Sequence, residues 1–231
     1  IQKDKELKQI SIKYLCSGIE IILTLLLLKN IASASKGKIV YLIDEPELHL
    51  HPKAQESLLN LLIEEAKDKQ IFISTHSPYM FKASIGLGAN ILLLKKNEHN
   101  EIDILNARNE GWGLFGELSP TWGEINWFAY SLPTVEFHNE LFGFLQSKAI
   151  DEEDSNSFER EFDEWLANKG AEQNCSWIKE RQGNIQAPQN RTLQTFIRNS
   201  IHHPENNHNS KYSNDELKSS IEKMIEIIKT L

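Results

Sequence analysis

The chain has few cysteines and no long hydrophobic run. Its 231 residues include two cysteines, Cys16 and Cys175, which are too few and too far apart for a disulfide framework or a Cys-x-x-Cys metal pair. This cysteine usage fits a reducing cytoplasm. The longest apolar run, residues 19–28, contains Glu20 and Thr24 and is too short to span a bilayer. Nothing at the start has the pattern of a signal peptide. The sequence therefore predicts a cytoplasmic protein that does not enter a membrane.

Basic residues are also in the minority. Lys and Arg together number 25 against 33 Asp and Glu, which gives a net charge of −8 at pH 7. This balance argues against a protein that coats nucleic acid non-specifically, but it leaves room for a local basic groove. The 40% hydrophobic and 25% charged content is ordinary for a globular protein, and the length suits one large or two small domains.

The most informative segment that is present covers residues 38–46 and has the sequence KIVYLIDEP. Its apolar, mostly β-branched residues predict a buried strand, and Asp44 and Glu45 follow at the carboxyl end, where open α/β sheets keep their sites. Two adjacent acids suit a division of labour: Asp44 would hold Mg²⁺ through water, and Glu45 would orient or deprotonate the water that attacks a nucleotide γ-phosphate. The alternative is a strand that ends in a solvated Asp-Glu turn.

A second apolar segment, residues 70–78 with the sequence QIFISTHSP, ends in the same way. Between the two, residues 52–67 carry apolar residues at helical spacing, so the unit is predicted to be strand–helix–strand. A right-handed crossover then makes the two strands parallel neighbours. This arrangement places His76 beside the two acids, where a neutral imidazole could reach a γ-phosphate and report its presence.

These segments resemble those of ABC-type ATPase heads. Residues 44–52, DEPELHLHP, and residues 74–78, STHSP, are similar to the Walker B, D-loop and switch-histidine segments. Their sequence pattern resembles most narrowly the branch that contains the OLD, RecF-like and antiviral PtuA-like ATPases. Residues 15–20, LCSGIE, stand where that family has its signature loop. The resemblance implies an α/β fold, ATP and Mg²⁺ as cofactors, and ATP sandwiched between two heads of a homodimer or higher oligomer. Ser17 and Gly18 would contact the γ-phosphate held by the opposite protomer.

The chain departs from that family in two ways. Cys16 replaces the first signature serine and Ile19 replaces the acidic residue, so the contact across the dimer would depend on Ser17, Gly18 and Glu20. There is also no Gly-x-x-x-x-Gly-Lys-Ser/Thr phosphate-binding loop. Because the sequence begins at Ile1 and not at Met, we expect it to be the C-terminal part of a longer ATPase. On its own it should not hydrolyse ATP.

The organisation changes near residue 106. Residues 91–96 and 102–105 are predicted to be a strand pair that finishes the sheet. The predicted domains are residues 1–105 as the C-terminal lobe of the ATPase, 106–133 as a Gly- and Trp-rich connector, and 134–231 as a helical bundle. The connector's tryptophans are expected to pack on adjoining helices, with a platform for nucleic-acid bases as the alternative.

The last domain is predicted to be all-helical. Apolar residues recur at helical spacing in four segments, which are 134–148, 157–169, 191–203 and 215–231. In the first of them Glu136, His138 and Glu140 could suggest a metal site. Their spacing of two residues scatters the histidine away from the acids, so a solvated face is expected instead. The fold class is therefore α/β, with half of an ABC-type ATPase sheet domain followed by an all-α bundle.

The third predicted helix carries candidate chemistry. At 100° per residue, Arg198, Asn199, His202 and His203 share the face opposite the apolar residues. An Arg and a His near one phosphodiester suffice for metal-independent RNA cleavage: the imidazole moves protons and the guanidinium stabilises charge on the phosphorus oxygens. The pattern resembles the Arg-Asn-x-x-x-His motif of HEPN ribonucleases, which implies roles for Arg198, Asn199 and His203. The alternative is a set of cations that stabilise a helix C-terminus and pair with Glu205.

The two resemblances together predict the ATPase component of a bacterial anti-phage defence system, in which ATP binding or hydrolysis is coupled to cleavage of RNA, with tRNA as one substrate. The competing prediction is a regulatory ATPase scaffold of the PtuA-like kind, found in Septu and retron-associated systems. There a separate partner subunit, such as an HNH-type nuclease, would cut the nucleic acid, and the bundle would serve assembly.

Overall fold

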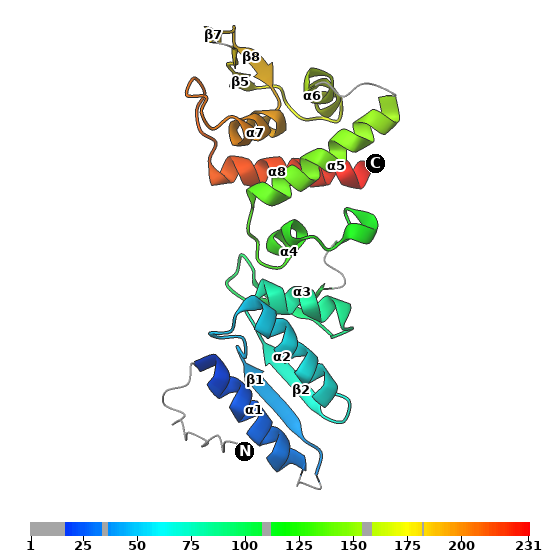
Figure 1. Ribbon diagram of the computed structural model, residues 1–231. Coiled ribbons are helices and arrows are strands. Elements are labelled where there is room, and N and C mark those ends of the chain that lie inside the picture. The colour runs from blue at the N-terminus through cyan, green and yellow to red at the C-terminus, as the bar shows by residue number, and fades with distance from the viewer. Residues whose placement is uncertain (1–16, 34–36, 108–111, 154–158, 182) are drawn as a thin grey trace, which may run out of the picture. The chain divides into compact units, whose positions relative to one another are not determined.

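The computed structural model describes residues 17–33, 37–107, 112–153, 159–181 and 183–231 (Figure 1). The chain divides into two compact units, Ile1–Ile91 and Leu92–Leu231, and each is described by itself. The observed fold class is mixed α/β, with an ATPase-like sheet region and a helical bundle, as predicted. The domain limits at residues 105 and 133 were drawn from composition and stay a prediction.

The first unit is built around a strand–helix–strand element. Its order is α1 (Ser17–Ser33), β1 (Val40–Asp44), α2 (Pro52–Glu65), β2 (Gln70–Ser74) and α3 (Pro78–Gly86). Strands β1 and β2 are parallel, with Val40 opposite Gln70 and Asp44 opposite Ser74, and α2 makes the crossover between them. The predicted parallel pair is therefore confirmed.

Helix α2 begins where the sequence has start signals for a helix. His51 is the N-cap residue, and its Nδ1 accepts a hydrogen bond from the backbone N–H of Lys53 at 3.3 Å. Pro52 occupies the first helical position, where its missing N–H costs nothing. The buried apolar side chains of this unit come from α2 and α3 and are Leu58, Leu59, Leu62, Met80 and Phe81.

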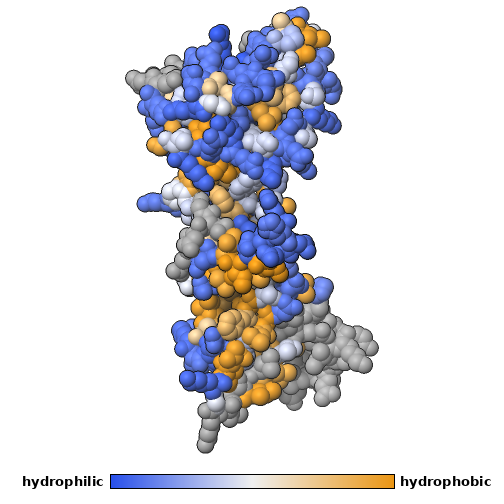
Figure 2. All heavy atoms as spheres, turned by 180° about the vertical axis from the view of Figure 1, so that it is seen from behind, coloured by the Kyte–Doolittle hydropathy of each residue, from blue (hydrophilic) through white to orange (hydrophobic). Residues whose placement is uncertain are grey.

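One face of the β1–β2 pair is open in the described part of the chain. Val40, Leu42 and Phe72 alternate with half-buried neighbours along the strands, and Leu42 is 79% exposed. Figure 2 shows hydrophobic side chains gathered over part of the first unit, while the visible face of the helical bundle is mainly hydrophilic.

The second unit begins with β3 (Leu92–Lys96) and β4 (Ile102–Asn106), which pair antiparallel with Leu93 opposite Leu105. The pair was expected to finish the sheet of the first unit. That prediction was wrong, because among the described residues β3 and β4 form a separate two-stranded sheet. Within the turn between them, the N–H of Asn97 donates to the carbonyl of Glu101 at 2.9 Å.

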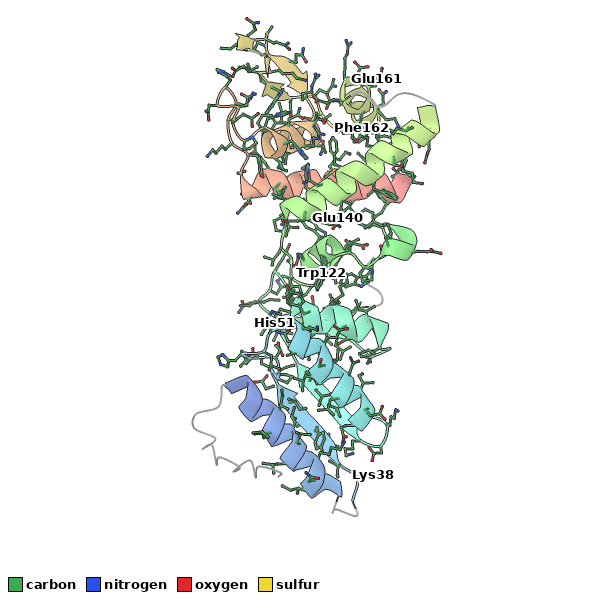
Figure 3. The ribbon with its side chains drawn as sticks, in the orientation of Figure 1. Lys38, His51, Trp122, Glu140, Glu161 and Phe162 are labelled. Atoms are coloured by element: carbon green, nitrogen blue, oxygen red, sulfur yellow. The ribbon has the colours of Figure 1, made fainter. Side chains whose placement is uncertain are left out.

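The connector packs on the bundle through Trp127, as predicted, whereas Trp122 is 40% exposed. It contains the 3₁₀ helix η3 (Gly116–Leu118) and α4 (Trp122–Phe128). The rings of Trp127 and Phe137 lie 6.1 Å apart. The buried Glu124 side chain accepts hydrogen bonds from the backbone N–H groups of residues 113, 114 and 121. Thr121 in turn donates to Glu140, labelled in Figure 3, at 2.5 Å.

The four predicted helices of the bundle are present as α5 (Val135–Glu153), α6 (Glu159–Asn168), α7 (Leu193–His202) and α8 (Asn214–Thr230). Their apolar sides meet in one core, to which Phe162 of α6 contributes its ring (Figure 3). The ring of Phe162 meets that of Phe142 edge-on at 4.9 Å. None of the described helices is both long and apolar enough to cross a membrane.

Short strands between α6 and α7 were not predicted. They are β5 (Cys175–Trp177), β6 (Glu180–Arg181), β7 (Asn184–Ile185) and β8 (Gln189–Arg191). Strand β5 pairs with β8 and β6 with β7, both antiparallel. We call residues 175–191 the β insert. Strands of two or three mainly polar residues show no alternating apolar pattern, so only helices were predicted for this part of the chain.

His138 does not lie on a solvated face, contrary to expectation. Its side chain is fully buried between α5 and α8, where Nε2 lies 3.0 Å from the Ser220 hydroxyl. Burial lowers the pKa of the imidazole to about 4. Spacing within one helix could not reveal this, because the partner that accommodates the ring lies 82 residues further along the chain.

Candidate functional site

The carboxyl ends of β1 and β2 bring three predicted residues together. Because Asp44 and Ser74 are register partners, the Ser74 hydroxyl donates a hydrogen bond to the Asp44 carboxylate. Glu45 follows directly, and its N–H donates to the carbonyl of Ser74 at 3.0 Å. The Nε2 atom of His76 lies 3.6 Å from a carboxylate oxygen of Glu45. The His76 ring is 88% exposed, so this group of side chains is open to a ligand.

The backbone at this edge of the sheet is unusual. Glu45 has a φ of +42° and His49 a φ of +63°, both in the left-handed region that non-glycine residues rarely adopt. Such a conformation costs on the order of 1–3 kcal/mol and persists only where neighbouring contacts enforce it. Glu45 adopts it directly after β1, at the position from which its carboxylate approaches His76.

Glu47 holds the segment that carries His76. The Glu47 side chain is buried, and its Oε1 accepts hydrogen bonds from the hydroxyl of Thr75 at 2.5 Å and the N–H of His76 at 3.1 Å. Its Oε2 is buried without a hydrogen-bond partner among the described residues. Glu47 and Ser74 were not predicted to be site residues. A third acid two positions after Glu45 was the only available signal.

The donors at this edge fit a nucleotide-bound magnesium ion. Mg²⁺ is usually held by one or two carboxylates together with waters and substrate phosphates. Asp44 supplies one exposed carboxylate, and Ser74 supplies a hydroxyl beside it. No group of three or more His, Cys, Asp or Glu side chains that could hold a metal by themselves occurs in the described parts of the chain.

The signature-like segment is described only in part. Ser17 and Gly18 are the first residues of α1, as expected for a loop that opens a helix. Residues 15 and 16 of this segment, and the side-chain environment of Ser17, lie outside what the structure describes. The predicted contact of Ser17 and Gly18 with a nucleotide therefore stays a prediction.

A second candidate site lies at the C-terminal end of α7. Arg198 packs over the ring of Phe142, with its guanidinium carbon 5.9 Å from the ring centroid. His203 is the C-cap residue, its side chain is 47% exposed, and its Nδ1 lies 3.4 Å from a Glu205 oxygen. Partial burial, together with the positive charges of Arg198 and His203, lowers the pKa of His202. The fold thus gathers Arg198, His202 and His203 at one end of the helix.

Asn199 does not share their outward face, and that prediction was wrong. It is 1% exposed, and its Nδ2 donates to Glu159 of α6 at 3.1 Å. Its Oδ1 accepts from Nη1 of Arg198 at 3.3 Å. The helical wheel counts only the residues of α7, so it cannot register a carboxylate on a neighbouring helix. Asn199 connects Glu159 to Arg198 and helps to hold the guanidinium in place.

Two acids of α6 organise the start of α7. Asp163 is fully buried and accepts hydrogen bonds from the N–H and the hydroxyl of Thr192, the N-cap residue, at 2.9 and 2.7 Å. Arg191 lies between Glu159, at 3.8 Å, and Asp163, at 4.0 Å. Neither acid was predicted to have a role. Their spacing of four residues, which places them on one face of α6, was the signal that could have found them.

A hollow of about 260 Å³ lies beside His203. It is lined by Trp177, Lys179, Glu180, His203, Glu205 and Asn206. The β insert and the loop after α7 are joined at Ile178. The side chains of Asn206 and Asn209 both donate to its carbonyl at 2.9 Å, and Asn209 Oδ1 accepts from its N–H at 2.7 Å.

Comparisons with known proteins bear on the first unit. The model of the AAA ATPase domain family matches residues 2–81, which is less than half of the chain. This match supports an ATPase-type domain there. No curated protein matches the chain.

One similar solved structure comes from work on the structural biochemistry of ATP-driven dimerization and DNA-stimulated activation of SMC ATPases. It is 16% identical with a TM-score of 0.35, and the alignment covers 41% of this chain and 55% of that one. The chain thus spans little more than half of that solved chain, and a likeness this weak carries no functional argument.

Proposed function

We propose that the protein is an ATPase whose first unit binds Mg²⁺–ATP at the carboxyl ends of β1 and β2. The observation that carries this proposal is the grouping of Asp44, Glu45 and His76 at one sheet edge. Asp44 would hold Mg²⁺, which supplies charge neutralisation for the phosphates. Glu45 would orient or accept a proton from the attacking water, and His76 would contact the γ-phosphate. Two heads would enclose the nucleotide, with Ser17 and Gly18 contributed by the opposite protomer.

We further propose that the second unit cleaves RNA at the end of α7. The His203 imidazole would move the proton of the 2′-hydroxyl or of the leaving group, and the Arg198 guanidinium would stabilise charge on the phosphorus oxygens. Support comes from the proximity of Arg198, His202 and His203 and from the exposure of His203. ATP binding or turnover in the heads would reposition the bundles and so license cleavage, which suits an anti-phage defence role.

One observation favours a second candidate function. Asn199, the middle residue of the motif, is buried against Glu159 and serves packing. A bundle whose motif residues mainly support the fold would suit a regulatory ATPase scaffold that controls a separate nuclease subunit, with the bundle used for assembly.

A cleavage assay on the full-length protein separates the two functions. Wild type is incubated with total tRNA and ATP and compared with His203→Ala and with His99→Ala, which removes an exposed histidine from the β3–β4 turn. The nuclease function predicts 2′,3′-cyclic-phosphate products from wild type and His99→Ala, formed without metal in the cleavage step, and none from His203→Ala. Intact RNA in every reaction, with ATP still hydrolysed, would support the scaffold.

A further inference from the structure

We propose that the hollow beside His203 binds one nucleotide of a single-stranded RNA, next to the phosphodiester that is cut, and that Lys179 contacts its phosphate. This inference rests on the proposed ribonuclease function and adds a substrate-binding site to it. The site joins two parts of the second unit that are far apart in sequence. Trp177, Lys179 and Glu180 come from the β insert, and His203, Glu205 and Asn206 come from the end of α7 and the loop after it.

Of the charged side chains that line the hollow, the Lys179 ammonium is the one available to a ligand. Glu205 lies 3.4 Å from His203, and Glu180 lies 3.2 Å from His208, so both carboxylates have a partner in the protein. The exposed ammonium of Lys179 makes no ion pair with any described residue within 4.0 Å. In a chain of net charge −8, an unpaired lysine beside a candidate catalytic histidine suits a phosphate of the substrate.

The walls of the hollow are held in place before any ligand binds. Asn206 and Asn209 fasten the loop to both backbone groups of Ile178. On the other side, the carbonyl of Lys179 accepts a hydrogen bond from the N–H of Gln186 at 2.9 Å. A site whose backbone is already ordered loses less conformational freedom when it binds, so even a small contact area can give useful affinity.

The size and the polar lining set the class of ligand. A volume of about 260 Å³ lies just below the roughly 300–1,000 Å³ of pockets for drug-sized ligands, so it fits one nucleotide and not a folded RNA. Carboxylates on the wall can accept hydrogen bonds from exocyclic amino groups of a base. Bases present these groups to a protein most readily in single strands, where they can be turned outward. Single-stranded RNA is therefore the substrate class that the hollow favours.

The test measures RNA binding and cleavage separately on the intact protein. The probe is a short fluorescent single-stranded RNA with 2′-O-methyl groups, which cannot be cut, and its affinity is measured over a range of KCl concentrations. Lys179→Ala is compared with Lys179→Arg, which keeps the charge. The matched control is Lys218→Ala, which removes another exposed cation, paired with Glu222 on α8.

Lys179→Ala should bind more weakly than wild type, and the slope of log affinity against log salt should become shallower by roughly 0.7, the value for one phosphate contact on a single strand. Lys179→Arg and Lys218→Ala should keep the wild-type slope. With cleavable RNA, Lys179→Ala should raise KM and leave kcat near wild type, whereas His203→Ala should lose kcat. Equal slopes for Lys179→Ala and Lys218→Ala would overturn the proposal.

The outcomes distinguish this site from the nuclease function. Cleavage that depends on His203, with a KM unaffected by Lys179→Ala, overturns the binding site and leaves the nuclease in place. Binding that depends on Lys179, without any cleavage, supports the site and overturns the nuclease. A wild-type protein that does not bind the probe overturns both.

Discussion

The two units place their polar residues by different physical means. In the first unit the order of elements along the chain positions the polar side chains: a strand, a crossover helix and a parallel strand bring Asp44 and Ser74 side by side. In the second unit a contact between two helices positions a polar side chain: Asn199 on α7 donates a hydrogen bond to Glu159 on α6, 40 residues away in the sequence. The Asp44–Ser74 contact is exposed, whereas Asn199 is buried.

This difference should appear in the energetics. An exposed hydrogen bond exchanges water partners for protein partners, so its loss costs little. A buried donor or acceptor that loses its partner costs about 1–3 kcal/mol, because water cannot replace the partner. We therefore expect changes at the exposed sheet edge to alter chemistry with little effect on stability, and changes at the buried polar residues of the bundle to lower stability.

The largest expected effect is that of Glu45→Gln on ATP turnover. In the proposed mechanism Glu45 orients or deprotonates the attacking water, so replacing its carboxylate should lower hydrolysis by the full-length protein by about 10²- to 10⁴-fold while the protein stays folded. Phosphate release measures turnover, and equilibrium binding of ATP checks that the site persists. Glu56→Gln, an exposed acid on α2, is the matched control. Equal turnover in the two variants would contradict the role of Glu45.

The next largest effect is a pH dependence in the bundle. Burial lowers the pKa of His138 to about 4 from an ordinary 6.5, so the folded protein binds this proton more weakly than the unfolded chain does. The stabilisation is complete above pH 6.5 and is lost as the pH falls toward 4, where the loss reaches about 3 kcal/mol.

Urea unfolding of wild type and His138→Gln between pH 7 and pH 4 measures this term. The difference in unfolding free energy between the two proteins should shrink as the pH falls. A difference that does not change with pH would show that His138 does not titrate in this window.

Asn199→Ala should destabilise the bundle by about 1–3 kcal/mol, because Asn199 is fully buried and the change removes its contacts with Glu159 and Arg198. Denaturant unfolding measures the loss. Asn207→Ala, at an exposed asparagine in the loop after α7, should stay within about 0.5 kcal/mol of wild type. If the two variants were equally stable, the expected cost of losing the buried contacts of Asn199 would be contradicted.

The smallest effect is expected for Ser74→Ala at the sheet edge. The hydroxyl is exposed, so stability should change by no more than about 0.5 kcal/mol. The same substitution at the buried Ser220, which contacts His138, should cost about 1–3 kcal/mol. Thermal or denaturant unfolding of the two variants makes this a direct comparison of one chemical change in two settings.

Much of the first unit could be predicted from sequence, since its order depends on local patterns. The apolar run before Asp44 and the helical spacing of residues 52–67 determined the strand–helix–strand element. The register that pairs Asp44 with Ser74 was not predicted and is seen in the structure. The role of Glu47 was not predictable, because its partners Thr75 and His76 lie across the crossover.

In the second unit the sequence predicted the four helices but not which polar residues are buried. Asn199 is hydrogen-bonded to Glu159, and His138 lies against Ser220. No sequence pattern within α7 or α5 predicts these partners on other helices. The β insert escaped prediction for another reason: its pairing contributes hydrogen bonds between very short polar strands, which leave no periodic signal.

The junction at Ile178 has a consequence for hydrogen exchange. Its amide proton is held by a side chain of the loop and not by a strand ladder, and the same loop holds its carbonyl. The amide can exchange with solvent only when its hydrogen bond to Asn209 breaks. Its exchange rate therefore reports how often the loop after His203 separates from the β insert. The exchange rate of this one amide thus measures how often the hollow opens.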